Sequence, residues 1–188
     1  AFCASYRVLE GIEKAGFKEA IRSIGKFPLI EKRSMSSSDN DQLVEQYKEY
    51  SRISDGSVLL GVCGGRNSEG QDFPGDEMNA VMICGIPYAS PTNRLKKKID
   101  YYDSIIEGNS SSGRILAYII PAIMRANQAC GRPIRTLQDH AAIILADYRF
   151  KSRRIAKLLS SWILKNIVAI RDKRGLLQAS IRNFYQTR

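Results

Sequence analysis

The sequence lacks the features that mark membrane proteins and metalloproteins. No run of 18 or more apolar residues occurs, so no membrane span is expected. The four cysteines, at positions 3, 63, 84 and 130, include no pair with the short spacing of a zinc or iron–sulfur site. Three of them lie in apolar runs, where cysteine acts as a small hydrophobic residue, so we expect reduced thiols and no metal. The only histidine, His140, is assigned no catalytic role.

Acidic residues are nearly absent from the end of the chain. Positions 151–188 hold ten Lys or Arg and one acid, whereas positions 1–150 hold 19 basic and 18 acidic residues, giving a net charge of +10. A basic stripe suits a phosphate backbone or an acidic partner surface, and it is also compatible with a solvated helix face. Charge alone leaves these interpretations open.

The length fits one globular domain, which we take to span residues 1–188. The chain starts directly on the apolar segment 1–5, without a signal-peptide pattern. A domain that starts on core material is expected to be a piece of a longer protein. We expect an intracellular location, cytoplasmic in a prokaryote and nuclear in a eukaryote.

Apolar runs alternate with amphipathic segments, which predicts an α/β fold. Alternation of this kind implies a mostly parallel sheet with helices on both faces. We expect strands at 1–5, 28–32, 57–64, 79–86 and 141–147, and helices at 6–16, 36–53, 95–106 and 121–131.

Three local features refine this pattern. Pro121 suits a first helical turn, so the last of these helices is expected to begin there. A Ser/Gly-rich linker, 109–113, precedes it. Residues 151–188 are expected to form a basic helical extension that packs on the domain through Ile155, Leu158, Leu159, Trp162, Ile163 and Ile167.

Two stretches carry candidate chemistry. The first, GGRNSEGQDFPGD at 64–76, follows an expected strand and offers glycines, a hydroxyl and carboxylates. Backbone amides in such a loop can hold a phosphate or a ribose hydroxyl, although a Gly-rich turn is also common without any ligand. The second, QACGRPIR at 128–135, places Arg132 and Arg135 on one side of a helical turn. Arginine forks suit phosphate oxygens, and they also pair with surface carboxylates.

Taken together, these stretches resemble a known family, the XPD-type superfamily 2 DNA helicases. GVCGGRNSEGQDFPGD resembles motif V, QACGRPIR resembles motif VI, and AFCASYRVLEGI is similar to motif IV. ICGIPYASP and DHAAIILADYRF also match the family's order, and the resemblance covers about residues 1–150. Two residues depart from the pattern, Gln71 in motif V and Pro133 in motif VI. Because proline ends a helix at the preceding residue, Arg135 is expected to leave a turn.

The resemblance implies a RecA-like three-layer fold and the second of two motor domains, with ATP and Mg²⁺ held between them. The chain has no G-x-x-x-x-G-K-[ST] box and no Asp-Glu-x-His motif, so the first motor domain and the family's iron–sulfur cluster are expected outside it. By resemblance, Arg132 and Arg135 supply charge to the transferred phosphate, and Gln128 bonds to the nucleotide or the attacking water. The isolated domain is expected to be inactive.

The family pattern also assigns the loop residues. By resemblance, Asp72 contacts the ribose of ATP or the hydration shell of Mg²⁺. Glu69 and Gly70 link the nucleotide site to the DNA groove. The candidates for contact with single-stranded DNA are Ser5, Tyr6, Arg66 and Ser68. Tyr6 could serve as an aromatic platform for a base, although an aromatic residue beside a strand end is more often part of the core.

The implied activity is 5′ to 3′ DNA unwinding in DNA repair, such as nucleotide excision repair, with repair-complex subunits as further partners. The compact insertion between Pro91 and Pro121 resembles the archaeal XPD pattern. Membership of the DinG-like or FancJ-like branch of the family is the alternative within the enzyme class. The alternative is a nonenzymatic module that binds nucleic acid or protein on a helicase-like fold.

Overall fold

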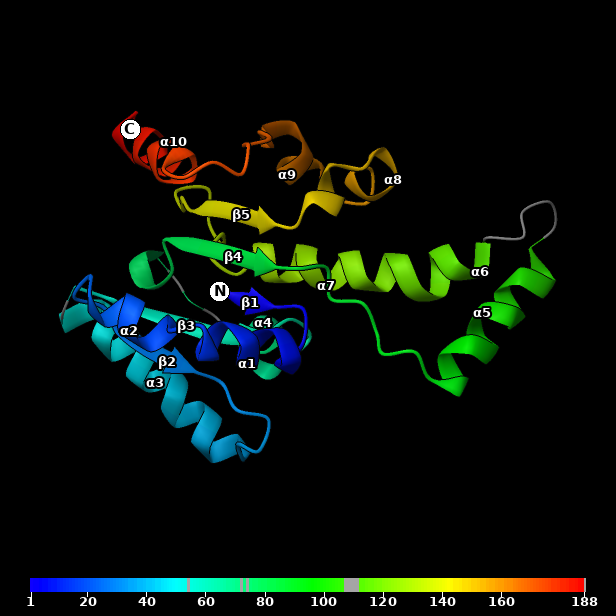
Figure 1. Ribbon diagram of the computed structural model, residues 1–188, viewed down its shortest axis with the longest axis horizontal. Coiled ribbons are helices and arrows are strands. Elements are labelled where there is room, and N and C mark those ends of the chain that lie inside the picture. Colours follow the sequence, from blue (N-terminus) through cyan, green and yellow to red (C-terminus); the bar gives the residue numbers. More distant parts are fainter. Residues whose placement is uncertain (54, 72, 74, 107–111, 188) are drawn as a thin grey trace.

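Five parallel strands form the centre of the protein, and helices lie on both sides of them (Figure 1). The computed structural model describes residues 1–53, 55–71, 73, 75–106 and 112–187. The spatial order is β2–β3–β1–β4–β5, and every described pairing is parallel, which confirms the predicted sheet. The strands are β1 (Phe2–Cys3), β2 (Phe27–Ile30), β3 (Ser57–Val62), β4 (Ala80–Cys84) and β5 (Ala142–Ala146).

Successive residues of a strand point to opposite faces, so the central strand β1 divides the core into two layers. Phe2 packs in a cluster with Val44 and Ile123, whereas Cys3 packs with Leu9 on the other face. The helices that cover the two faces are therefore α1 (Tyr6–Lys14) and α2 (Phe17–Arg22) on one side, and α3 (Ser37–Ile53) and α7 (Ile120–Cys130) on the other. This arrangement confirms the three-layer fold.

A helical arm leaves the sheet after β4 and returns along α7 (Figure 1). The arm consists of α5 (Asn93–Ile105), α6 (Ser112–Arg114), the π-helical turn η2 (Ile115–Ile119) and α7. Residues 109–111 of the expected linker lie outside the described residues.

Pro121 lies in the first turn of α7, as predicted, but α7 does not start a separate helix. Ile119 and Ile120 are both helical, so α6, η2 and α7 form one continuous helix from Ser112. Proline inside a helix removes a hydrogen-bond donor and clashes with the preceding turn. The π turn immediately before Pro121 widens the helix at that point and accommodates the ring.

The C-terminal region begins with η3 (Tyr148–Lys151), α8 (Arg153–Ala156) and α9 (Ser161–Asn166). Of the expected apolar side, Ile155, Leu159 and Ile163 are buried in the core, while Trp162 and Ile167 stay 40% and 43% exposed. The final helix, α10 (Leu176–Gln186), is almost entirely exposed. Its Tyr185 hydroxyl donates to the backbone carbonyl of Asn79, beside the start of β4.

Candidate functional site

The motif V stretch forms a tight loop at the end of β3, followed by the short helix α4 (Arg66–Glu69). Gly64 has a φ of +77°, a left-handed conformation that favours glycine. A Cβ on Gly65 would lie 2.9 Å from the carbonyl oxygen of Val62 and 3.0 Å from a carboxylate oxygen of Glu31. Glycine is therefore required at both positions, at Gly64 by the backbone conformation and at Gly65 by the close approach of Val62 and Glu31.

A buried polar network lies directly behind this loop. Glu31 and Asn67 have exposed fractions of 4% and 0%. Asn67 Nδ2 donates to Glu31 Oε2 at 2.9 Å and to Asn40 Oδ1 at 2.9 Å, and Asn40 Nδ2 donates back to Asn67 Oδ1 at 3.0 Å. The Tyr6 hydroxyl donates to Glu31 Oε1 at 2.7 Å. The network thus joins motif IV, the end of β2, the start of α3 and motif V.

Tyr6 is held by this network. Burial raises the pKa of the phenol to about 12, and the hydrogen bond to Glu31 acts in the same direction. The protonated hydroxyl is therefore the donor that the carboxylate needs. One face of the ring lies 6.0 Å from the guanidinium carbon of Arg33. Tyr6 is half-buried, so the ring combines a packing position with an accessible edge.

Arg132 joins motif VI to motif V. Its Nε, Nη1 and Nη2 atoms donate to the backbone carbonyls of Ser68, Gln71 and Glu69 at 2.8, 2.7 and 2.5 Å. These carbonyls lie at and just beyond the C-terminal end of α4, where backbone acceptors have no partner within the helix. The guanidinium therefore caps α4 from another part of the chain, with charge-assisted bonds at the negative end of the helix.

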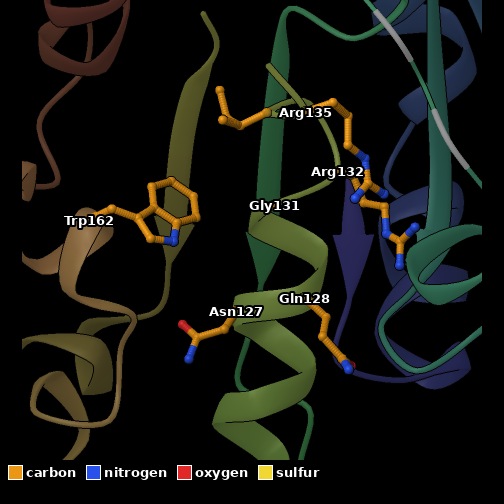
Figure 2. A pocket seen from close by; sticks show the side chains of 7 residues that line it. Asn127, Gln128, Gly131, Arg132, Arg135 and Trp162 are labelled. Carbon is orange, nitrogen blue, oxygen red and sulfur yellow. The ribbon is translucent and has the colours of Figure 1, made fainter. Parts of the chain in front are cut away.

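The end of α7 also carries an open cavity of about 410 Å³ (Figure 2). In Figure 2, the side chains of Gln128, Arg132 and Arg135 extend from α7 and the following turn on the same side, whereas Trp162 lies on the opposite side of α7. The predicted turn is confirmed: α7 ends at Cys130, and Arg135 lies beyond it, where its backbone amide donates to Asp139 Oδ2 at 2.6 Å. The lining is Asn127, Gln128, Gly131, Arg132, Ile134, Arg135 and Trp162.

Asn127 fixes the opposite wall of this cavity. Its Nδ2 donates to the carbonyl of Leu158 at 3.0 Å, and its Oδ1 accepts from the amide of Ser160 at 3.1 Å. These two bonds hold the turn between α8 and α9 against α7. Trp162 follows that turn, so its position at the cavity depends on Asn127.

The remaining predicted site residues are more dispersed. Ser5 is exposed and caps α1 by accepting from the amide of Val8 at 3.4 Å, and Arg66 is exposed at the start of α4. Glu69 and Gly70 are exposed at the end of α4, close to Arg132. Asp72 lies outside the described residues.

Ser68 requires a correction. It is fully buried, and its hydroxyl donates to the carbonyl of Gly65 at 3.0 Å. The hydroxyl therefore closes the α4 turn, and the expectation that it contacts DNA is wrong for this structure.

The strand-and-turn segment after motif VI forms a second polar cluster. Asp147 accepts from Arg149 Nε at 2.9 Å and Nη2 at 2.6 Å, and from the amide of Ile86 at 3.3 Å. The hydrogen bonds from Arg149 hold the pKa of Asp147 below its usual range. The Arg149 guanidinium lies 5.4 Å from the Tyr88 ring centre, and Tyr88 stacks on Tyr118 at 4.6 Å. This cluster fastens the root of the arm to the ends of β4 and β5.

The sequence analysis missed several residues that organise the site, among them Glu31, Asn40 and Arg125. Arg125 Nη1 donates to the carbonyl of Pro87 at 2.6 Å, and its side chain packs against Gly64. A charged residue at the end of the apolar segment PLIE was a usable signal for Glu31, because a buried strand end rarely carries a carboxylate without a purpose. Nothing in the sequence marked Asn40 or Arg125.

In the described part of the chain, no group of three or more His, Cys, Asp or Glu side chains is arranged to hold a metal ion. Within the same residues, no helix has the length and apolar character needed to cross a membrane.

A parallel sheet with motifs V and VI joined by an arginine is the arrangement expected of the C-terminal domain of a helicase. The family model described as "Helicase C-terminal domain" matches residues 1–166. The chain therefore belongs to the helicase C-terminal domain family, and the predicted resemblance to the C-terminal domain of a DNA helicase is confirmed.

Curated relatives and a solved structure agree with this assignment. The chain is 32% identical over 166 residues to a regulator of telomere elongation helicase 1 homolog from Oryza sativa subsp. japonica, covering 85% of this chain and 16% of that protein. It is 28% identical to the ATP-dependent DNA helicase chl-1 of Caenorhabditis elegans, covering 78% of this chain and 18% of that protein. The solved structure titled "XPD_Helicase" has the same fold, with a TM-score of 0.59, 22% identity and coverage of 84% of this chain and 26% of that one. The chain thus spans less than a fifth of these two curated relatives.

Proposed function

We propose that this domain forms one wall of an ATP-binding cleft in a DNA helicase, and that the first motor domain of the same polypeptide forms the other wall. The chain's family membership and the names of its relatives support a helicase role. The observation that carries the proposal is the Arg132 clamp, which joins motif VI to motif V and leaves Gln128 and Arg135 at the same open cavity.

The cavity suits the phosphates of a nucleotide. Its polar groups are two amides, two guanidinium groups and the indole N–H of Trp162, and the described lining contains no carboxylate. Arginine forks bind phosphate oxygens through paired donors. With Mg²⁺, ATP supplies the phosphoanhydride bond whose cleavage drives the helicase. This chain supplies positive charge and amide groups on one side of it.

The geometry supports a division of labour between the two arginines. Arg132 fixes the motif V loop through three backbone carbonyls, while Arg135 is exposed on the turn beyond α7. We assign charge stabilisation during phosphoryl transfer chiefly to Arg135, and loop positioning to Arg132. Gln128 orients the nucleotide or the attacking water from the last turn of α7.

Hydrolysis in this scheme depends on closure of the two domains, because Arg135 reaches the phosphates only when the cleft is shut. The same motion moves the edge that carries Ser5, Tyr6 and Arg66 along single-stranded DNA, in the 5′ to 3′ direction typical of the family. The helicase would serve in DNA repair. The isolated domain hydrolyses no ATP, because it has no phosphate-binding lysine box of its own.

The test is DNA-stimulated ATP hydrolysis by the intact protein. In related nucleotide hydrolases, an arginine supplied by a neighbouring domain is worth about 10³ to 10⁵ in rate. Arg135→Ala is expected to lower turnover on the order of 10³-fold and to leave single-strand affinity close to wild type. Arg22→Ala, an exposed arginine on α2, is the control and should change neither quantity. Turnover by Arg135→Ala within twofold of wild type would contradict the proposal.

A further inference from the structure

One face of α5 carries basic and aromatic side chains that the nucleotide site does not use. At about 100° per residue, Arg94, Lys97, Lys98, Tyr101 and Ile105 all fall within about 60° of one line along the helix. All five are exposed, Tyr101 at 60% and Ile105 at 53%. We call these five residues the arm stripe.

The opposite face of α5 is packed, so the stripe has a fixed direction. Leu95, Ile99 and Tyr102 are half-buried toward the rest of the arm. α6 lies so close that a Cβ on Gly113 would sit 2.1 Å from the carbonyl of Ile99. The amide of Gly113 also donates to Asp103 Oδ1 at 2.8 Å. These contacts leave the arm stripe directed to solvent.

The charge of α5 is placed where it opposes helix formation. The first turns carry Arg94 and three consecutive lysines, and the first turn holds no acidic residue. Cations near a helix N-terminus are disfavoured by the helix dipole, by about 0.3–1 kcal/mol each. Thr92 caps the helix by accepting from the amide of Leu95 at 3.2 Å, which offsets part of this cost. A polyanion laid along the stripe would remove the repulsion.

The arm and the motif IV segment leave the sheet at the same edge. β1 pairs with β4 in parallel, with Cys3 opposite Cys84. β1 leads into Ser5 and Tyr6, and β4 leads into the arm, so both depart from the same edge of the sheet (Figure 1). A strand of nucleic acid that crosses the motif IV edge can therefore extend along α5.

We propose that the arm stripe binds single-stranded DNA. Arg94, Lys97 and Lys98 contact backbone phosphates, and the Tyr101 ring stacks on a base. Single-strand sites combine positive charge with exposed aromatic rings in this way. The proposal rests on the proposed function, since it extends the DNA path of that helicase domain.

The test measures single-strand affinity of the intact protein as a function of salt, with oligo(dT) as the probe. Each phosphate contact on a single strand contributes about 0.7 to the slope of log K against log salt. The triple variant R94Q/K97Q/K98Q should lower that slope by about 2 and weaken binding on the order of 10- to 100-fold at 0.1 M salt. Tyr101→Ala should weaken binding roughly 5- to 150-fold without changing the slope.

Lys96→Gln is the matched control. Lys96 is exposed on the same helix but lies about 200° from Arg94, so its substitution should leave affinity and slope close to wild type. The melting temperature of the triple variant should be equal to or above that of wild type, because the change removes repulsion at the helix N-terminus.

Unchanged affinity and slope in the triple variant would overturn the inference. So would equal losses in the triple variant and in Lys96→Gln, which would indicate a general charge effect. If Tyr101→Ala binds oligo(dT) as wild type does, the stacking contact is refuted. These outcomes test DNA binding by the arm stripe and leave the ATP-binding cleft untouched. A loss of ATP turnover in Arg135→Ala would support the cleft whether or not the arm stripe binds DNA.

Discussion

The variant Arg132→Ala tests whether Arg132 positions the motif V loop or acts only on a bound ligand. The variant removes three donors from the carbonyls of Ser68, Glu69 and Gln71, which lie at the end of α4. If Arg132 holds the motif V loop before any nucleotide binds, the loss must appear in the stability of the protein without ATP. If the arginine acts only on phosphate, stability should not change.

The magnitude follows from the number and setting of the bonds. A hydrogen bond that involves a charged group contributes about 1.5–3 kcal/mol when its partner is shielded. Arg132 is half-buried, so water partly replaces each bond and a value near 1 kcal/mol applies to each. Arg132→Ala should therefore lower the free energy of unfolding by about 3 kcal/mol. Arg132→Lys should recover about a third of this, because an ammonium cannot span three carbonyls.

Two assays measure this effect. Urea unfolding gives the change in the free energy of unfolding, and hydrogen exchange locates it. The amides of Glu69 and Gly70, which donate to Gly65 and Arg66 within α4, should exchange on the order of 100-fold faster. The amide of Leu9, in α1 on the opposite face, is the internal reference. Arg22→Ala, which changes an exposed arginine on α2, is the control variant and should leave both measurements close to wild type.

The reasoning is refuted if Arg132→Ala unfolds within about 0.5 kcal/mol of wild type and exchange at Glu69 and Gly70 is unchanged. The three bonds would then have no net effect on the loop. The assignment of Arg132 to loop positioning would have to be abandoned in favour of a purely catalytic role.

Two further predictions concern buried polar groups. Asn67→Ala should lower the free energy of unfolding by about 2–4 kcal/mol, because it leaves Glu31 and Asn40 with unmet hydrogen bonds in the core, and a loss below about 0.5 kcal/mol in urea would contradict the network. Asp147→Asn should lower the melting temperature near pH 7, because it weakens the contact with Arg149. Since folding depresses the pKa of Asp147, its contribution is present above the unfolded value of about 3.9 and is lost as pH falls through the folded pKa. The two melting curves should therefore converge below about pH 4, and a constant difference down to pH 2 would show that the charge of Asp147 is irrelevant.

The strands and most helices could be predicted because their signals are local. The apolar runs around Leu60 and Ile83 are long enough to be buried on both faces, and they form β3 and β4 as expected. Pro121 predicted the start of α7 to within one residue, but it gave no sign of the π turn and of α6 before it. The π turn packs against α5, a contact between segments that no local sequence pattern predicts.

The candidate site divides in the same way. Spacing placed Arg132 and Arg135 on one side of a turn, and the structure agrees (Figure 2). Spacing did not show that Arg132 binds backbone carbonyls, because carbonyls belong to every residue and leave no trace in the sequence. Ser68 shows the reverse case, since a hydroxyl in a loop looks available until the fold buries it.

The sequence by itself determined the alternation of strands and helices, the basic C-terminal region and the order of motifs IV, V and VI, because each depends on residues close together along the chain. Only the tertiary structure decided that Glu31, Asn40 and Asn67 share one network and that Arg132 caps α4. These contacts join residues that are 27 to 64 positions apart. Which distant groups meet is fixed by strand order and helix packing, and the physics of burial then selects the partners that can satisfy one another.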